Sequence, residues 1–165
     1  ITDGQILLKP ELFYAGIRPA MDVGASVSRV SSARSRAMRA VAGTLKGDLS
    51  QYNEMKAFAQ FGTEGLDQAT RDVLNHGERL TELLKQNQFS PQSLGEQTVV
   101  LFSASKIDDV PTSDVQRFEA ELLEYIRNGH ADIIESVNET FDLSDEIKSK
   151  LDSAVDGFKA AFQSS

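Results

Sequence analysis

The sequence predicts a mainly α protein, in which an antiparallel helical bundle follows a short strand-containing remnant of a larger α/β domain. Residues 1 to about 32 are punctuated by glycines and prolines that separate short segments. From about residue 33 onward, apolar residues recur every three or four positions, which is the period of an amphipathic helix. We therefore expect two parts, the end of one domain over residues 1–33 and a helical bundle domain over residues 34–165.

Two strands are predicted in the first part, over residues 6–8 and 23–30. In the second strand, the apolar residues Val23, Ala25 and Val27 alternate with small or polar residues, the pattern of a half-buried strand. Two short strands do not make a stable sheet alone, so this part is expected to be the edge of a larger sheet. Because the sequence starts at an isoleucine rather than a methionine, we expect a piece of a longer protein.

A first helical region is predicted from about residue 33 to Gly62. Gly43 and Gly47 lie inside it, and each weakens a helix by roughly 1 kcal/mol relative to alanine. We expect them to mark a break or a close approach of another backbone. The apolar stripe of this region consists of Met38, Val41, Leu45, Leu49, Tyr52, Met55 and Phe58.

Capping residues and prolines define the remaining helices. Asp67 is expected to cap one helix, and Ser93 with Glu96 has the spacing of a capping box. The apolar run over residues 98–102 fits a helix or a strand by its pattern, and the cap favours a short helix. Further helices are expected after Pro111, through residues 133–137 and from Ser144. The apolar face of the helix capped by Asp67 carries Ala69, Val73, Leu80, Leu83 and Leu84. The faces of the later helices carry Val115, Phe118, Leu122, Leu123 and Ile126, then Ile133, Ile134 and Val137, and finally Ile147, Leu151, Val155, Phe158 and Phe162.

Composition excludes several classes of function. The 165 residues carry a formal net charge of −8, and an acidic protein is a poor candidate for general nucleic-acid binding. The absence of cysteine excludes disulfides, thiolate zinc sites and cysteine nucleophiles. Two histidines do not make a histidine-rich metal site. No apolar run approaches the roughly 20 residues that span a bilayer, and no leader is recognisable, so we expect no direct membrane insertion.

The sequence contains no phosphate-binding loop and no complete catalytic motif. Its acidic clusters, at residues 108–109, 119–124 and 145–146, are interpreted as solvated helix faces or caps without raised pKa values. The arginines within residues 34–39 are interpreted as a polar helix face. Arg29 differs because it ends an alternating strand, and ligands of open α/β sheets bind beyond the carboxyl ends of strands. From pattern alone, Arg29 is either a surface cation or a cation that reaches a phosphate on a neighbouring subunit.

Several long blocks of the sequence, in order and in register, resemble one known family. They include ITDGQILL, LFYAGIRPA, VGASVSRV and GERLTELLKQ. The sequence resembles the alpha subunit of the F-type ATP synthase over most of its length, and more loosely after about Pro111. The pair Val23-Gly24 and the block LLKQ at residues 83–86 favour alpha over the related beta subunit. The resemblance places residues 1–33 at the end of a P-loop-type nucleotide-binding domain and residues 34–165 in the C-terminal helical domain.

In that family, alpha and beta subunits alternate in a hexamer around a rotating gamma shaft, and the complex couples ATP synthesis or hydrolysis to hydrogen ion transport. The resemblance implies a regulatory, non-catalytic alpha subunit that binds ATP or ADP with Mg²⁺, whose phosphate and Mg²⁺ ligands lie upstream of this piece. It implies beta and gamma subunits as partners, and delta and the peripheral stalk through the full-length protein. It also implies a peripheral membrane complex on the cytoplasmic face of a bacterial plasma membrane, or on the matrix or stromal face in an organelle. This piece alone is not expected to be catalytic.

The first site that the resemblance implies is catalytic. Arg29 matches the arginine finger that alpha extends into the adjacent beta catalytic site, where its planar donors stabilise charge on the transferring phosphoryl group. Ser26 matches a serine that the family needs for activity, and we expect it to support the strand of Arg29.

The second implied site is the adenine pocket of the non-catalytic nucleotide. Arg18 and Pro19 match residues that pack near the base, with Phe13 nearby. Gln86 and Gln88 match glutamines that face the adenine, whose polar edge an amide can pair with. Without the resemblance, these two glutamines read as an ordinary polar turn before a proline.

Four places depart from the pattern of the family. Met21 stands where Ile, Leu or Val is usual, and residues 31–35 replace a glycine-containing segment with one about one residue shorter. Gly65 is an insertion, and about two residues are missing around residues 103–107. These departures leave an alternative, a divergent alpha-like paralogue that acts as a structural or protein-interaction module without an ATPase role.

Overall fold

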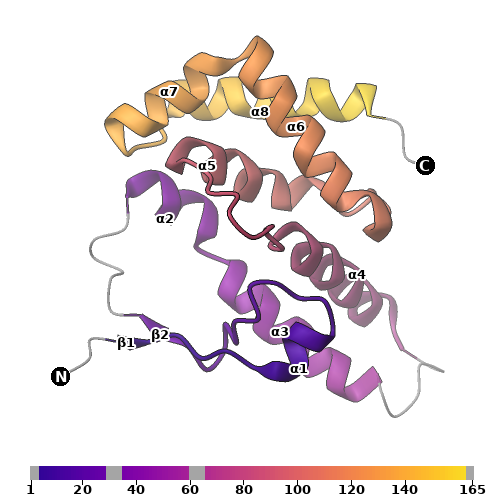
Figure 1. Ribbon diagram of the computed structural model, residues 1–165. Coiled ribbons are helices and arrows are strands. Elements are labelled where there is room, and N and C mark those ends of the chain that lie inside the picture. Colours follow the sequence, from indigo (N-terminus) through magenta and orange to yellow (C-terminus); the bar gives the residue numbers. More distant parts are fainter. Residues whose placement is uncertain (1–3, 29–34, 60–65, 163–165) are drawn as a thin grey trace.

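The computed structural model describes residues 4–28, 35–59 and 66–162, and its architecture is mainly α (Figure 1). The predicted fold class, a helical bundle preceded by a strand-containing segment, is confirmed. The bundle contains α2 (Arg36–Ala42), α3 (Leu45–Ala59), α4 (Gln68–Leu83), α5 (Leu94–Ser103), α6 (Val115–Gly129), α7 (Ala131–Thr140) and α8 (Asp145–Ala161). Two short 3-10 turns, η2 (Ala104–Lys106) and η3 (Thr112–Asp114), link α5 to α6. In Figure 1, α6, α7 and α8 lie uppermost, with α2, α4 and α5 below them and α3 lowest.

The N-terminal segment, residues 4–28, lies against the lower part of the bundle in Figure 1. Strands β1 (Gly4–Gln5) and β2 (Val27–Ser28) pair antiparallel, and Leu8 and Met21 form an isolated bridge. The short helix α1 (Pro10–Tyr14) lies between the two halves of this hairpin-like segment.

The strand predicted over residues 23–30 is wrong for residues 23–26, because residues 23–25 form a turn and residue 26 lies outside any strand. The Asp22 carboxylate accepts a hydrogen bond from the backbone N–H of Ala25 at 3.0 Å, and the Asp22 carbonyl accepts one from Ser26 at 2.9 Å. An aspartate that bonds to the backbone ahead of it favours a turn over an extended strand. The predicted strand at residues 6–8 is likewise reduced to the bridge at Leu8. Residues 29 and 30 lie outside the described part of the sequence.

The predicted break in the first helical region is confirmed at Gly43, where α2 ends and α3 follows after Thr44. Leu49 and Tyr52 of α3 are buried, whereas Phe58 is exposed, so the buried stripe ends before the last turn. At the contact of α3 with α4, a Cβ placed on Gly77 would lie 2.2 Å from Cγ of Tyr52. The absence of a side chain at Gly77 therefore lets the Tyr52 ring pack directly on α4.

The predicted caps are confirmed. Asp67 accepts from the backbone N–H of Thr70 at 2.8 Å and starts α4. The Ser93 hydroxyl accepts from the N–H of Glu96 at 3.3 Å, while the Glu96 carboxylate accepts from the N–H of Ser93 at 2.6 Å. This capping box makes the ambiguous apolar run at residues 98–102 a helix, as its cap predicted.

The hydrophobic core lies between α4, α5, α6, α7 and α8. Most of the predicted apolar-face residues of α4, α6 and α8 are buried, whereas Ala69 is exposed and Val73, Leu84 and Phe162 are half-buried. Edge-to-face rings of Phe118 and Phe158, with centroids 5.2 Å apart, join α6 to α8. The largest fully buried side chains include Leu80, Val99, Ile107, Phe118, Leu122, Ile126, Ile133, Leu151 and Val155. Within the described ranges, no helix is both long enough and apolar enough to cross a membrane.

Candidate functional site

The N-terminal segment meets the bundle at the loop between α4 and α5. The backbone N–H of Gln86 donates to the carbonyl oxygen of Arg18 at 2.8 Å. The guanidinium carbon of Arg18 lies 4.4 Å from the centroid of the Phe13 ring, a cation–π contact. Three of the residues predicted for an adenine site, Phe13, Arg18 and Gln86, therefore come together at one place, which we call the junction cluster.

A closed loop of the N-terminal segment positions Arg18. Lys9 donates its backbone N–H to the carbonyl of Ala20 at 2.9 Å, and its ammonium lies 2.5 Å from the Asp22 carboxylate. Because Lys9 donates a hydrogen bond to it, the pKa of the Asp22 carboxyl is lowered below its ordinary value. These contacts close the base of the loop that carries α1, Arg18 and Pro19, and the Arg18–Pro19 peptide bond is cis.

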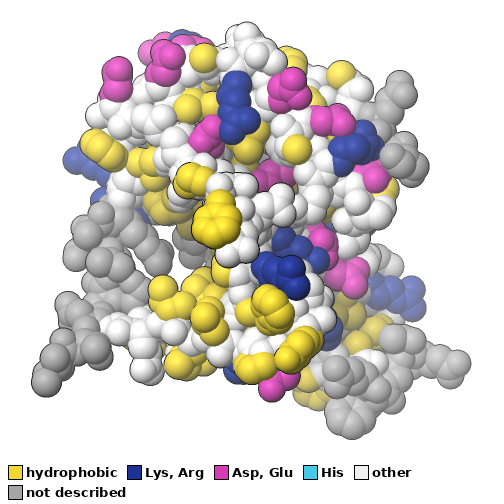
Figure 2. All heavy atoms as spheres, viewed as in Figure 1, with side chains coloured by type: hydrophobic (Ala, Val, Ile, Leu, Met, Phe, Trp, Pro, Cys, Tyr) yellow, Lys and Arg dark blue, Asp and Glu magenta, His cyan; other side chains and the backbone are white. Residues whose placement is uncertain are grey.

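The surface of this segment is apolar. Figure 2 shows hydrophobic side chains gathered over the lower half of the visible face, where the N-terminal segment lies in Figure 1. The exposed side chains include those of Ile6, Leu8, Phe13, Tyr14 and Val27.

The second half of the junction is the 86–92 loop, which follows α4. The side-chain amide of Gln86 donates to the carbonyl of Ser90 at 2.7 Å and closes the loop on itself. At its far end, the amide of Gln92 donates to the Glu119 carboxylate of α6 at 2.9 Å. Gln88 is exposed in the turn at the tip of the loop. The side-chain nitrogen of Gln86 therefore holds the loop closed, while its side-chain oxygen is the atom suited to accept a hydrogen bond from a ligand.

The structure places the remaining predicted site residues as follows: Ser26 lies in the turn region of the N-terminal segment, Pro19 adjoins Arg18, and Arg29 falls outside the described residues. The hydroxyl oxygen of Ser26 accepts from the backbone N–H of Leu7 at 3.1 Å, so it ties this turn region to the opposite half of the N-terminal segment. Pro19 is exposed next to Arg18. Arg29, the predicted finger, lies outside the described residues.

Glu119 corrects one expectation for the acidic clusters. Only 9% of this residue is exposed, and burial raises the pKa of its carboxyl above the ordinary value, against the opposing effect of the Gln92 hydrogen bond. The sequence did contain a signal for this burial. Glu119 precedes Leu122 by three residues and Leu123 by four, so it shares a helix face with these two core residues.

We expect Glu119→Gln to stabilise the protein at neutral pH. In the folded protein the pKa of Glu119 is raised above its ordinary value of 4.5. The protonated side chain therefore contributes its full stability below pH 4.5, and this contribution is lost as pH rises through the folded pKa. Glutamine keeps the shape of the side chain and carries no charge. The free energy of unfolding of the Glu119→Gln variant should therefore exceed that of wild type at pH 7, and the two values should converge near pH 4.

Urea unfolding at a series of pH values would measure this difference. Glu121→Gln is the matched control, because Glu121 lies on the same helix with an exposed carboxylate paired with Arg117. A pH-independent difference between Glu119→Gln and wild type would contradict the expectation.

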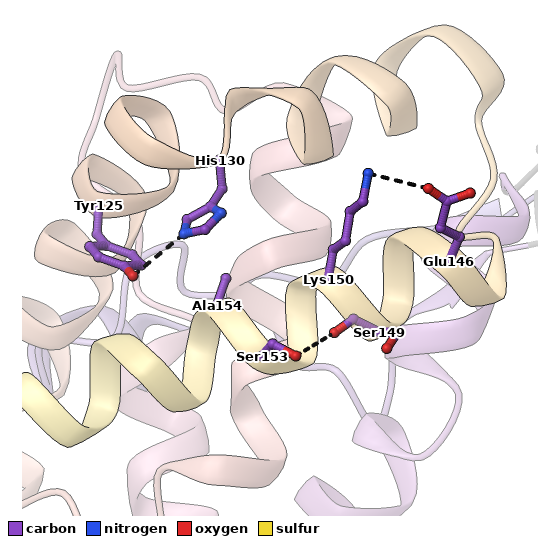
Figure 3. Close-up of a pocket in the computed structure, with 7 residues that line it drawn as sticks. All are labelled: Tyr125, His130, Glu146, Ser149, Lys150, Ser153 and Ala154. Carbon is purple, nitrogen blue, oxygen red and sulfur yellow. Dashed lines mark hydrogen bonds and ion pairs between the residues drawn. The ribbon is translucent and has the colours of Figure 1, made fainter.

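A second concave region lies between the α6–α7 corner and α8, far from the junction cluster. It is an open groove of about 520 Å³, lined by Tyr125, His130, Glu146, Ser149, Lys150, Ser153 and Ala154 (Figure 3). Lys150 is held by Glu146 at 3.3 Å and by Asp132 at 3.4 Å, and His130 lies 3.4 Å from the Tyr125 hydroxyl. The Glu146 hydrogen bond, followed by that of Asp132, raises the pKa of Lys150. The polar groups of this groove thus neutralise one another, which makes it a weak candidate for a charged ligand.

The junction cluster combines three kinds of planar or polar group. A flat aromatic ring, a planar guanidinium and an amide oxygen are groups that bind a purine by stacking and by pairing with its edge. Across residues 4–28, 35–59 and 66–162, no three His, Asp or Glu side chains come together in a way that could hold a metal ion. The described residues thus bring together groups of the kinds that bind a base, and they contain no candidate set of ligands for Mg²⁺.

Comparison with protein families identifies the bundle. A family model described as "ATP synthase alpha/beta chain, C terminal domain" matches residues 34–158. The protein therefore belongs to the family formed by the C-terminal domains of ATP synthase alpha and beta subunits. This description covers both kinds of subunit, and it sets the bundle in the context of an ATPase complex that uses nucleotide.

Proposed function

We propose that this protein is the C-terminal part of an alpha subunit of the F-type ATP synthase. In this proposal it supports ATP synthesis and hydrolysis at alpha/beta interfaces, with Arg29 as a finger acting on the adjacent beta site and Ser26 supporting it. Beta and gamma subunits are its partners, delta and the peripheral stalk contact the full-length protein, and the complex is peripheral on the membrane. The proposal puts the domain boundary after residue 33, and a family match that begins at residue 34 supports it.

The observation that carries the proposal is the hydrogen bond between Gln86 and Arg18. It joins a residue of the N-terminal segment to a loop of the bundle, and the Arg18–Phe13 stack lies beside it. Two of the residues named by the resemblance thus meet although they lie far apart in the sequence. Their meeting supports an adenine site at the junction, with Pro19 and Gln88 beside it and the phosphates held upstream.

Binding of MgATP to the full-length protein tests this function. Arg18→Ala should raise the dissociation constant roughly 2- to 30-fold, because it removes the cation from the junction cluster. Equilibrium dialysis with labelled ATP measures the change. Arg39→Ala is the matched control, since Arg39 is an exposed arginine in the last turn of α2 and should leave affinity unchanged.

The alternative function is a divergent alpha-like paralogue that serves as an interaction module. The altered segment at residues 31–35 and the insertion at Gly65 favour it. A full-length protein that binds no nucleotide, yet still binds beta and gamma, would support this alternative and contradict the proposed adenine site.

A further inference from the structure

Phe89 combines two features that the fold of the protein does not explain. Its side chain is 91% exposed, and its backbone has a φ of +60°. Residues with a Cβ are disfavoured in this left-handed region, where glycine and asparagine are the usual occupants. A large apolar side chain therefore stands where a small or polar residue would be less strained and better hydrated.

Phe141 is the instructive comparison, because it also has a positive φ, +55°, and an exposed ring. Its conformation ends α7, where its N–H donates to the carbonyl of Val137 at 2.9 Å, and its own carbonyl accepts from Ala37 at 3.2 Å. A left-handed residue is common at the end of a helix. Phe89 lies instead in the turn with Gln88, between α4 and α5, so the end of a helix does not account for it.

The 86–92 loop is fixed at both ends. Gln86 bonds to Arg18 and Ser90, and Gln92 bonds to the buried Glu119. Strained backbone persists where the surrounding structure over-determines it, and such positions cluster at binding sites. The exposed Phe89 ring therefore stands on a fixed loop, three residues after Gln86 of the junction cluster.

We propose that Phe89 is a further binding residue of the adenine site and stacks its ring on the base of the bound nucleotide. This inference rests on the proposed function. A purine has two faces and one polar edge, and aromatic rings stack on its faces whatever its substituents. Phe13 with Arg18 offers one flat surface, the amides of Gln86 and Gln88 suit the edge, and Phe89 supplies a second flat surface from the same loop as the amides.

A tryptophan at position 89 would report the contact directly. Residues 1–165 contain no tryptophan, so Phe89→Trp is prepared in a full-length protein in which it is the only tryptophan. Titration with MgATP should quench its emission, with the same dissociation constant that equilibrium dialysis gives for labelled ATP. Phe141→Trp, the matched control at the other exposed positive-φ phenylalanine, should not respond. Tripolyphosphate, which lacks the base, should leave both emissions unchanged.

Affinity gives a second readout. Phe89→Asn suits the left-handed backbone, so the variant should unfold at a temperature no lower than wild type. It should nevertheless raise the dissociation constant for MgATP roughly 5- to 100-fold, the effect of losing one stacked aromatic ring. Phe89→Tyr keeps the ring and should retain the affinity of wild type.

The outcomes separate this inference from the function on which it rests. If wild type and Phe89→Asn bind ATP equally and the emission at position 89 does not respond to it, the stacking role is wrong while the adenine site stands. If the emission responds to the beta subunit and not to ATP, Phe89 is a subunit contact and the stacking role is again wrong. If wild type binds no ATP at all, both the adenine site and the role of Phe89 are overturned.

Discussion

Replacing Gly95 with alanine is expected to lower the free energy of unfolding by about 2–3 kcal/mol, the upper part of the range for overpacking. A Cβ placed on Gly95 would lie 2.5 Å from the carbonyl oxygen of Ile134 and 2.9 Å from its Cα. These are backbone atoms of α7, so a side-chain rotation cannot relieve the clash. The N–H of Gly95 also donates to the Asn138 side chain at 2.7 Å, a bond that any separation of α5 and α7 would stretch.

Chemical denaturation of the purified protein measures this effect. Gly47→Ala is the matched control, because a Cβ at Gly47 in α3 would meet nothing within 4 Å. The control should gain up to about 1 kcal/mol from helix propensity. If Gly95→Ala proved as stable as Gly47→Ala, the close packing of α5 on α7 would be contradicted.

Replacing Arg29 with alanine is expected to lower ATP turnover by a reconstituted alpha–beta–gamma ring roughly 10³-fold or more, with the ring still assembled. The magnitude is that of arginine fingers in related phosphoryl-transfer enzymes, where the guanidinium stabilises charge on the transferring group. The prediction rests on the sequence resemblance at Ser26 and Arg29, since Arg29 lies outside the described residues. The affinity of the ring for nucleotide should change far less than its turnover.

Two further variants sharpen the Arg29 test. Arg29→Lys keeps the charge and loses the planar pair of donors, so turnover should remain well below that of wild type. Arg39→Ala removes an exposed cation of α2 and should leave turnover within about two-fold of wild type, as surface substitutions usually do. Equal turnover of wild type and Arg29→Ala would favour the interaction-module alternative.

Local signals made most of the fold predictable. The helices began where Asp67, Ser93 and Ser144 predicted, because a side-chain oxygen that caps backbone N–H groups acts within a few residues. The strand prediction failed at residues 23–26. These small residues alternate as a strand would, but the Asp22 carboxylate accepts from the N–H of Ala25 and favours a turn. Strand pairing depends on partners distant in sequence, so alternation in a short segment decides little by itself.

The candidate site was predictable only in part. Family resemblance named Phe13, Arg18 and Gln86, yet composition and periodicity could not bring them together, because their contact depends on how the N-terminal segment folds onto the bundle. Helix geometry could have identified the burial of Glu119. The positive φ of Phe89 depends on the closed 86–92 loop, and the sequence signals it only by one aromatic residue in a polar turn.

We propose above all that this protein completes catalytic sites carried by a beta subunit. The most direct measurement is ATP hydrolysis by beta and gamma subunits reconstituted with and without the full-length protein, with the assembled mass determined in parallel. We expect a ring that contains the protein and hydrolyses ATP well above the rate of beta and gamma alone. A protein that forms no ring with them, or a ring whose hydrolysis stays at the rate of beta and gamma alone, would contradict this proposal.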